Sequence, residues 1–262
     1  MKFENTEVWG FEHALRGMRN PKESWSKSDS SFQVFNLDEG DVSPSYLIKN
    51  MHNVYIAEQH YNISGTLVSY KSIIIGENDM KLAQALIRAG AEHRKFLRQI
   101  FVSVDITAPL YWWKEFDTYK VGTVANSTST MHKLTSKPIT LDCFEIDDYY
   151  NSLSLIDDTN IGVRVDYFIE YLEQLRQKYL ETKDKKYWKE LIRWIPESWL
   201  QTRTVTMNYE NLLGMCSKGQ RRFHKLNEWS GIDNETCENF IGWARTLPYA
   251  QEFIFIDEKG VN

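Results

Sequence analysis

Residues 109–134 read PLYWWKEFDTYKVGTVANSTSTMHKL and divide into an aromatic half and a polar half. The aromatic half follows Pro109, which suits the first turn of a helix, and its rings recur at helical spacing. We therefore expect one amphipathic helix there. Residues 122–132 are mainly serine, threonine and asparagine with no acid among them, and Lys120 and Lys133 stand on either side.

Two interpretations of this polar half stay open. Short hydroxyl and amide side chains cannot build a core, yet they offer many donors, and beside a cation they suit a phosphate or the edge of a heterocycle. The alternative is a solvated loop that uses the same side chains for turns and caps. Taken alone, the stretch is more typical of the loop.

The stretch resembles a motif of the flavin-dependent thymidylate synthases (ThyX), in which RHR at a helix end is followed by xxSxNExSxRY. The family's RHR falls on residues 119–121, its asparagine on Asn126 and its second serine on Ser129. Ser127 takes the place of the family's glutamate, and no arginine of the motif is kept. The order and spacing of the remaining positions carry the resemblance.

A second block, residues 195–229, resembles the C-terminal part of the same family. ThyX enzymes have a Leu-Pro, a helix of the type NLRxLLxFLxLR, and HAQxEIR at the start of the next helix. Asn208 and Asn211 match the helix in spacing, and His224 and Glu228 fit the histidine and glutamate of HAQxEIR. The two blocks occur in the family's order and at roughly the family's separation.

A third, smaller match lies before the aromatic helix. Residues 79–89 place apolar side chains on one face and predict a helix, which Gly90 and the following residues close. His93 then takes the place of the histidine in the family's Gly-His, and Phe96 that of a phenylalanine. Including this match, the resemblance extends over about residues 78–250.

The resemblance implies an α+β fold with a mainly antiparallel sheet flanked by helices, in a single ThyX-like domain spanning residues 1–262. It also implies a homo-oligomer, a tetramer, because family sites are shared between subunits.

The implied function is that of a divergent thymidylate synthase-like methyltransferase acting on a pyrimidine deoxynucleotide monophosphate such as dUMP. FAD would be the cofactor and a folate the one-carbon donor. The alternative is a ThyX-fold protein without catalysis that binds nucleotides or serves in assembly. The missing arginines favour this alternative, because lysine does not reproduce a bidentate guanidinium.

Site residues follow from the resemblance position by position. The substrate-binding candidates are Lys120, Asn126, Ser127, Ser129, Arg221 and Arg222. The cofactor-binding candidates are His93, Arg94, Trp113, Asn208, His224 and Glu228. No catalytic residue is identified, and no metal site is expected.

Length, net charge, cysteine spacing and hydropathy exclude several classes of protein. A chain of 262 residues can bury a sizeable core, and a formal net charge of −5 argues against a protein that coats nucleic acid. The three cysteines lie far apart without metal-ligand spacing, so a reducing compartment fits best. No apolar run is long enough to cross a bilayer, and the first residues are too polar for a signal peptide. We expect a cytoplasmic protein without membrane partners.

Periodicity predicts further elements outside the matched blocks. They are a helix over 11–19, a strand around 32–35, a buried strand over 66–75, a strand over 101–106, and helices over 164–180, 183–194 and 240–247.

Overall fold

The computed structural model describes residues 1–51, 54–146, 161–217, 224–231 and 238–258. The chain divides into two compact units. Unit 1 comprises residues 1–4, 104–120 and 124–205, and unit 2 comprises residues 5–103, 121–123 and 206–262. The prediction of a single domain stays a prediction.

The strands form two sheets. A four-stranded sheet has the order β1-β5-β7-β6, and a three-stranded sheet has the order β2-β4-β3. The strands are β1 (Lys2–Trp9), β2 (Ser31–Asn36), β3 (Val54–Tyr61), β4 (Leu67–Ile74), β5 (Phe101–Pro109), β6 (Val124–Ser127) and β7 (Leu200–Asn208). With helices flanking antiparallel sheets, the fold class is α+β, as predicted.

Helices account for most of the remaining described residues. They are α1 (Phe11–Arg19), α2 (Pro44–Asn50), α3 (Glu77–Arg88), α4 (Leu110–Phe116), α5 (Thr130–Lys133), α6 (Ile161–Thr182), α7 (Lys185–Trp194), α8 (Tyr209–Cys216), α10 (Asn227–Ser230), α11 (Phe240–Arg245) and α12 (Ala250–Phe253). Each predicted helix occurs, with bounds that agree to within a few residues. None of the described helices is long and apolar enough to cross a membrane.

The polar stretch differs from the expected loop. Residues 124–127 form β6, which lies at one end of the four-stranded sheet, and residues 130–133 form the short helix α5. All four β6 side chains are exposed, so the strand has no apolar face that its sequence could reveal. Strands β1, β3 and β7 are likewise not predicted from the sequence, because their polar residues dilute the strand signal.

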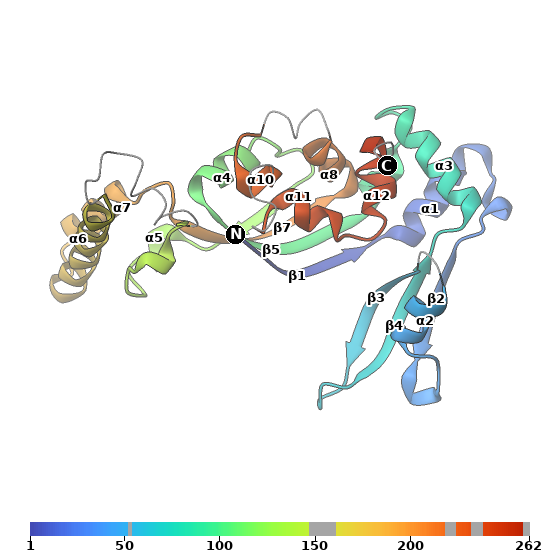
Figure 1. Cartoon of the computed structure of the whole chain (residues 1–262), viewed down its shortest axis with the longest axis horizontal. Coiled ribbons are helices and arrows are strands. Elements are labelled where there is room, and N and C mark those ends of the chain that lie inside the picture. The colour runs from blue at the N-terminus through green and yellow to red at the C-terminus, as the bar shows by residue number, and fades with distance from the viewer. Residues whose placement is uncertain (52–53, 147–160, 218–223, 232–237, 259–262) are drawn as a thin grey trace. The chain divides into compact units, whose positions relative to one another are not determined.

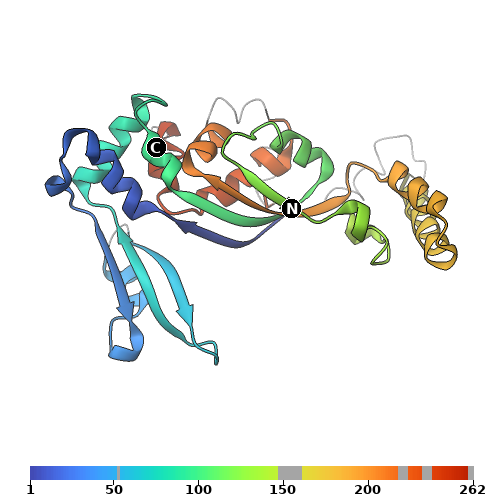
Figure 2. The same ribbon diagram turned by 180° about the vertical axis from the view of Figure 1, so that it is seen from behind.

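Within unit 2, the three-stranded sheet is antiparallel throughout. Ile74 of β4 pairs with Ser31 of β2 on one side and with Val54 of β3 on the other. A register shift between Ala57 and His60 marks an irregularity in β3. The three strands run side by side in opposite views (Figure 1; Figure 2), and α2 lies against β3.

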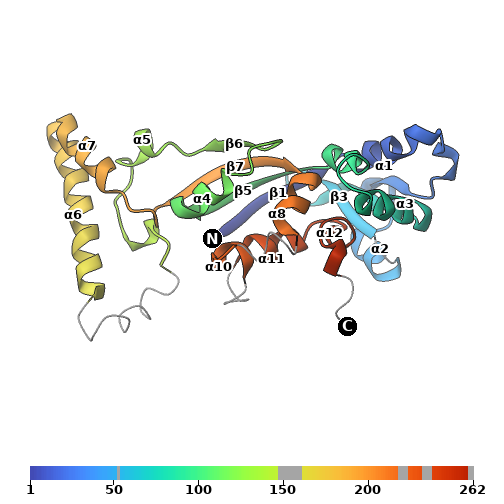
Figure 3. The ribbon, with the colours of Figure 1, turned by 90° about the horizontal axis from the view of Figure 1, so that it is seen from above.

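Helices and aromatic side chains build the core of unit 2. Phe11 of α1 is 1% exposed and packs edge-on against Tyr209, with ring centroids 5.6 Å apart. Phe253 of α12 contacts Phe11 and also Phe96, which follows α3. Figure 3 shows α8, α10, α11 and α12 close together, and α11 contacts each of the other three. The buried rings of unit 2 thus come from segments far apart in the sequence.

Within unit 1, the long helix α6 packs against α7, and both are seen side by side in Figure 1. Leu172, Leu175 and Leu191 form the centre of their apolar contact. Beside it, Glu173 accepts two hydrogen bonds from Arg176, at 2.7 and 2.6 Å, and one from the backbone N–H of Ile139, at 2.8 Å. This carboxylate therefore attaches the segment before residue 141 to α6.

The Glu173 contacts predict how stability depends on pH. Hydrogen bonds from Arg176 lower the pKa of Glu173 from 4.5 to about 2, against the raising effect of burial. Because the pKa is lower in the folded state, the stabilisation is complete above about pH 4.5 and is lost as the pH falls towards 2. We expect Glu173→Gln to reduce the free energy of unfolding at pH 7 by about 2 to 3 kcal/mol.

Urea unfolding of the wild type and the Glu173→Gln variant at several pH values measures this effect. The difference between the two proteins should shrink as the pH is lowered. Glu170→Gln is the matched control, because Glu170 is an exposed glutamate of the same helix that accepts only a 3.3 Å bond from Gln174. A difference that stays constant from pH 7 to pH 3, or an equal loss in Glu170→Gln, would contradict the assignment.

Candidate functional site

In unit 1, the C-terminal part of the polar stretch is hydrogen-bonded to β7. The backbone N–H of Thr128 donates to the carbonyl of Thr202 at 2.9 Å. Gln201 reaches from β7 with its Nε2, which lies 2.9 Å from the carbonyl of Thr128 and 3.3 Å from Oγ1 of Thr130. Ser129 caps α5 by accepting from the N–H of His132 at 3.2 Å. The stretch is thus anchored where β6 passes into α5.

Three of the substrate-binding candidates in unit 1 remain accessible. The side chains of Asn126 and Ser127 are exposed. Lys120 is exposed as well, and within the described part of the chain it forms no hydrogen bond or ion pair. An amide, a hydroxyl and an ammonium therefore stay available for a ligand, and all three are suited to phosphate oxygens.

Trp113 lies in the core of unit 1. It is 1% exposed, its Nε1 donates to the carbonyl of Gln201 at 2.9 Å, and the guanidinium of Arg203 lies 4.2 Å from its ring centroid. Arg203 also donates to Asp117 at 2.9 Å. The Trp113 ring therefore offers no open face to a planar ligand in this conformation, and its assignment as a cofactor contact stays a prediction.

In unit 2, residues 121–123 of the first matched block meet the start of α8 in the second. Asn208 and Asn211 form a reciprocal capping box, in which each side chain accepts from the other's backbone N–H, at 3.0 and 3.1 Å. Asn211 also donates through Nδ2 to the carbonyl of Val121 at 2.6 Å. The asparagines matched to the family's helix thus hold the chain directly after Lys120.

Gly122 is required at this junction. Its φ of +82° is in the left-handed region, which side chains other than glycine's rarely adopt. A Cβ there would also lie 3.2 to 3.3 Å from the amide groups of Asn208 and Asn211. The change of direction between α4 and β6 therefore depends on this glycine and on two asparagines about ninety positions away.

His93 lies at a hollow of about 690 Å³ in unit 2. The hollow is lined from three segments: the end of α1 and the turn after it, α3, and residues 92–99. Its lining includes Asn20, Lys22, Leu86 and Phe96 besides His93. A hollow of this volume is within the range of pockets that hold small molecules and cofactors.

Arg94, next to His93, is already paired. Its Nε lies 3.0 Å from each carboxylate oxygen of Glu210 in α8. This contact fastens the turn after α3 to the start of α8. Within the described residues, the other nitrogens of the guanidinium form no hydrogen bond, but its charge is balanced by Glu210.

The last candidates lie near α10. His224 is 6% exposed and stacks on Trp229, with ring centroids 4.0 Å apart and planes 17° from parallel. Glu228 is partly buried in the first turn of α10. Arg221 and Arg222 lie outside the described residues. Among the described residues, no three or more His, Cys, Asp or Glu side chains are arranged to hold a metal ion.

Sequence reasoning missed the role of Gln201. It is 9% exposed and connects β7 to both Thr128 and Thr130. The available signal was the alternation of polar and apolar residues in RTVTMN at 203–208, which is typical of a strand. A strand there would have predicted that the Gln201 side chain points inwards, where a buried glutamine needs hydrogen-bond partners.

Comparisons with known proteins find similarity in structure but not in sequence. No protein-family model and no curated protein matches the chain. Among solved structures, the chain is similar to the flavin-dependent thymidylate synthase ThyX from Helicobacter pylori complexed with FAD and dUMP. The TM-score is 0.55 at 14% identity, over 98% of this chain and 99% of that chain.

Two further solved structures are similar to the chain. A second structure of ThyX from Helicobacter pylori with FAD and dUMP gives the same TM-score of 0.55 at 14% identity, over 98% of each chain. A UMP/dUMP methylase, PolB from Streptomyces cacaoi bound with 5-Br dUMP, has a TM-score of 0.43 at 14% identity, over 69% of this chain and 82% of that chain. The match to the two ThyX structures shows a ThyX-like fold, as the sequence resemblance predicted.

The junction in unit 2 gives a prediction about two glycines. Gly122→Ala should lower the free energy of unfolding by about 1 kcal/mol or more, since it strains a positive φ and crowds the two asparagines. Gly214→Ala is the matched control, because this glycine lies inside α8 with no atom within 4 Å of an added Cβ. There, alanine should stabilise by about 0.5 to 1 kcal/mol through its helix propensity.

Thermal or urea unfolding of both variants decides the matter. Opposite signs support the junction as described. If Gly122→Ala were as stable as the wild type, residues 121–123 would not be held against α8 in solution.

Proposed function

We propose that this protein binds a pyrimidine deoxynucleotide monophosphate such as dUMP and modifies it as a divergent ThyX-like methyltransferase, with FAD as cofactor and a folate as one-carbon donor. The structures with the same fold contain FAD and dUMP. The proposal transfers these ligands to a chain that shares 14% of its residues with those proteins, so it also needs support from the chain itself.

The observation that carries the proposal is the contact between the two matched blocks. In unit 2, Asn211 of the second block binds the carbonyl of Val121 in the first. In unit 1, Gln201 and Thr202 of the second block bind Thr128 of the first. Two sparse motifs, recognised separately in the sequence, are thus in contact within each unit.

The nucleotide phosphate would be held by Lys120 with the polar side chains of Asn126, Ser127 and Ser129. An ammonium next to hydroxyl and amide donors is a suitable set for a phosphate monoester. Arg221 and Arg222 are proposed as further phosphate ligands from their place in the motif alone.

Fewer observations support a site for FAD than support the nucleotide site. The hollow at His93 has the volume for part of a cofactor, and Asn208, His224 and Glu228 stand at family positions. When bound, FAD would supply the hydride transfer that methylation by this route needs. The protein's part would be to position the ring and to hold the phosphates with Arg94 and other donors.

A second candidate function, a ThyX-fold protein without catalysis that binds nucleotides or serves in assembly, is favoured by one observation. Arg94 and Arg203 belong to the matched region, and both are paired with carboxylates of the protein, Glu210 and Asp117. Guanidinium groups balanced in this way attract a phosphate less than unpaired ones would.

We further propose that the chain is a single ThyX-like domain, forms a homotetramer and acts in the cytoplasm. Sedimentation equilibrium of the purified protein tests the assembly, and a monomer across the micromolar range would contradict it.

Visible absorption separates the two candidate functions. A preparation reconstituted with FAD should retain the flavin's absorption bands after desalting if the enzyme proposal holds. A colourless protein that nevertheless binds dUMP would instead support binding without catalysis, and a protein that binds neither ligand would contradict both.

Titration calorimetry with dUMP tests the proposed phosphate ligands. Lys120→Ala should weaken dUMP binding about tenfold and Asn126→Ala about fivefold, since each removes a donor to the ligand. Lys137→Ala is the control, because Lys137 is an exposed lysine outside the matched positions. Unchanged affinity in both test variants would remove the polar stretch from the site.

A further inference from the structure

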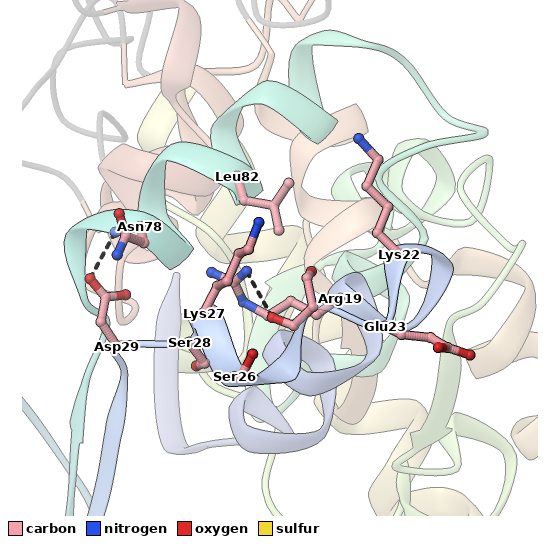
Figure 4. A pocket seen from close by; sticks show the side chains of 10 residues that line it. Arg19, Lys22, Glu23, Ser26, Lys27, Ser28, Asp29, Asn78 and Leu82 are labelled. Atoms are coloured by element: carbon pink, nitrogen blue, oxygen red, sulfur yellow. Dashed lines mark hydrogen bonds between the residues drawn. The ribbon is translucent and has the colours of Figure 1, made fainter.

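A second hollow of unit 2, about 830 Å³ in volume, lies beside the turn that follows α1 (Figure 4). Residues 22–24 and 26–29 line it from the turn, and Asn78 and Leu82 line it from α3. It adjoins the hollow around His93, but Arg19, Ser26 and Lys27 line this one alone.

Arg19 is the fixed element of this pocket. Only 4% of it is exposed, and its Nε donates to Asp79 at 2.5 Å while Nη1 donates to the carbonyl of Ser24 at 3.3 Å. Asp79 is 0% exposed and accepts two further hydrogen bonds, from Ser28 at 2.5 Å and from Ser30 at 2.6 Å. The guanidinium therefore has one orientation, set by a carboxylate that is itself fully bonded.

One edge of this guanidinium is left for a ligand. Nη2 of Arg19 forms no hydrogen bond within the described part of the chain. Nη2 is also not among the described polar atoms that are both unbonded and closed off from solvent. Its N–H groups are therefore accessible to an anion oxygen, which would accept a charge-assisted hydrogen bond from them.

The other charges around the pocket favour an anion. Lys22 and Lys27 form no ion pair within the described residues, and in Figure 4 both side chains extend towards the side where Leu82 lies. The acids are turned elsewhere: the Glu23 carboxylate points away from the guanidinium, and Asp29 accepts from the N–H groups of Asn78 and Asp79. Two unpaired ammonium groups thus accompany the open edge of Arg19.

Burial of the Arg19–Asp79 pair strengthens this interpretation. Desolvation raises the pKa of Asp79, but the hydrogen bonds from Ser28, Ser30 and Arg19 together hold it below its usual range. Asp79 is therefore ionised at neutral pH and balances the charge of Arg19. An entering anion then meets the two ammonium groups and a guanidinium that needs no reorganisation, while the carboxylates of Glu23 and Asp29 are directed elsewhere.

We propose that this pocket binds the phosphate group of a small molecule, a phosphate monoester or diphosphate, between the Nη2 edge of Arg19 and the ammonium groups of Lys22 and Lys27. The hydroxyls of Ser24 and Ser26, which also line the pocket, supply further donors. Lys22 and Ser24 also line the hollow around His93 that is proposed for FAD. The site involves none of the residues of the polar stretch, so it stands whether or not the nucleotide site at Lys120 is correct.

Titration calorimetry of the full chain tests the site with inorganic phosphate, pyrophosphate and AMP as probes. The wild type should bind at least one of them, and the Lys22→Ala/Lys27→Ala double variant should bind it at least about tenfold more weakly. Both lysines are at the surface, so the double variant should keep the wild-type melting temperature. Stronger binding of AMP than of the inorganic anions would indicate an ester as the ligand, and the reverse would indicate a free anion.

Two further variants make the test specific. Lys81→Ala removes an exposed lysine of α3 that pairs with Glu77 and does not line the pocket, so it should bind like the wild type. Lys137→Ala removes an exposed lysine that belongs to neither proposed site, so it should also bind the inorganic anions like the wild type. The proposal is overturned if no probe binds, if the double variant keeps full affinity, or if Lys81→Ala loses as much affinity as the double variant.

Discussion

The contact of Asn211 with the backbone at Val121 is the constraint on which the candidate site depends. The carboxamide of one residue closes the first turn of α8 and also holds a segment about ninety positions earlier. Because Gly122 needs a positive φ there, this segment has little freedom of its own. The orientation of the chain after Lys120 is thus set by a helix cap, an interaction normally considered only for its effect on the helix.

Much of the fold could be predicted from periodicity. The helix predicted over residues 11–19 has those bounds, and the apolar stripe of α6 is in place with Leu172 and Leu175 buried. These elements have one strongly apolar face, and that face is what a sequence reveals. Strand β6 has none, since it contributes only exposed side chains at the end of a sheet. Its position follows from hydrogen bonds to β7, which no local pattern encodes.

The site could be predicted as a set of positions but not as a set of contacts. The matched motifs located Asn208 correctly at a helix start, where its side chain caps α8. They did not indicate that Arg94 and Arg203 would each be neutralised by a nearby carboxylate. Trp113 shows the same limit. Helical spacing does not tell whether its ring is buried, and it does not reveal that the guanidinium of Arg203 covers the ring. Ion pairs and hydrogen bonds between residues far apart in the sequence decide which polar groups remain available for a ligand, and only the three-dimensional structure reveals them.

The position of β6 at the end of its sheet has a consequence for self-association. An edge strand presents unpaired backbone groups to other molecules, and long apolar edges promote aggregation. β6 is four residues long, and Asn126 and Ser127 make half of it polar. The side chains that suit a ligand therefore also discourage strand pairing between copies of the protein. Replacing Asn126 and Ser127 with isoleucine or valine would remove the donors and at the same time make the edge strand prone to pair with other copies of the protein.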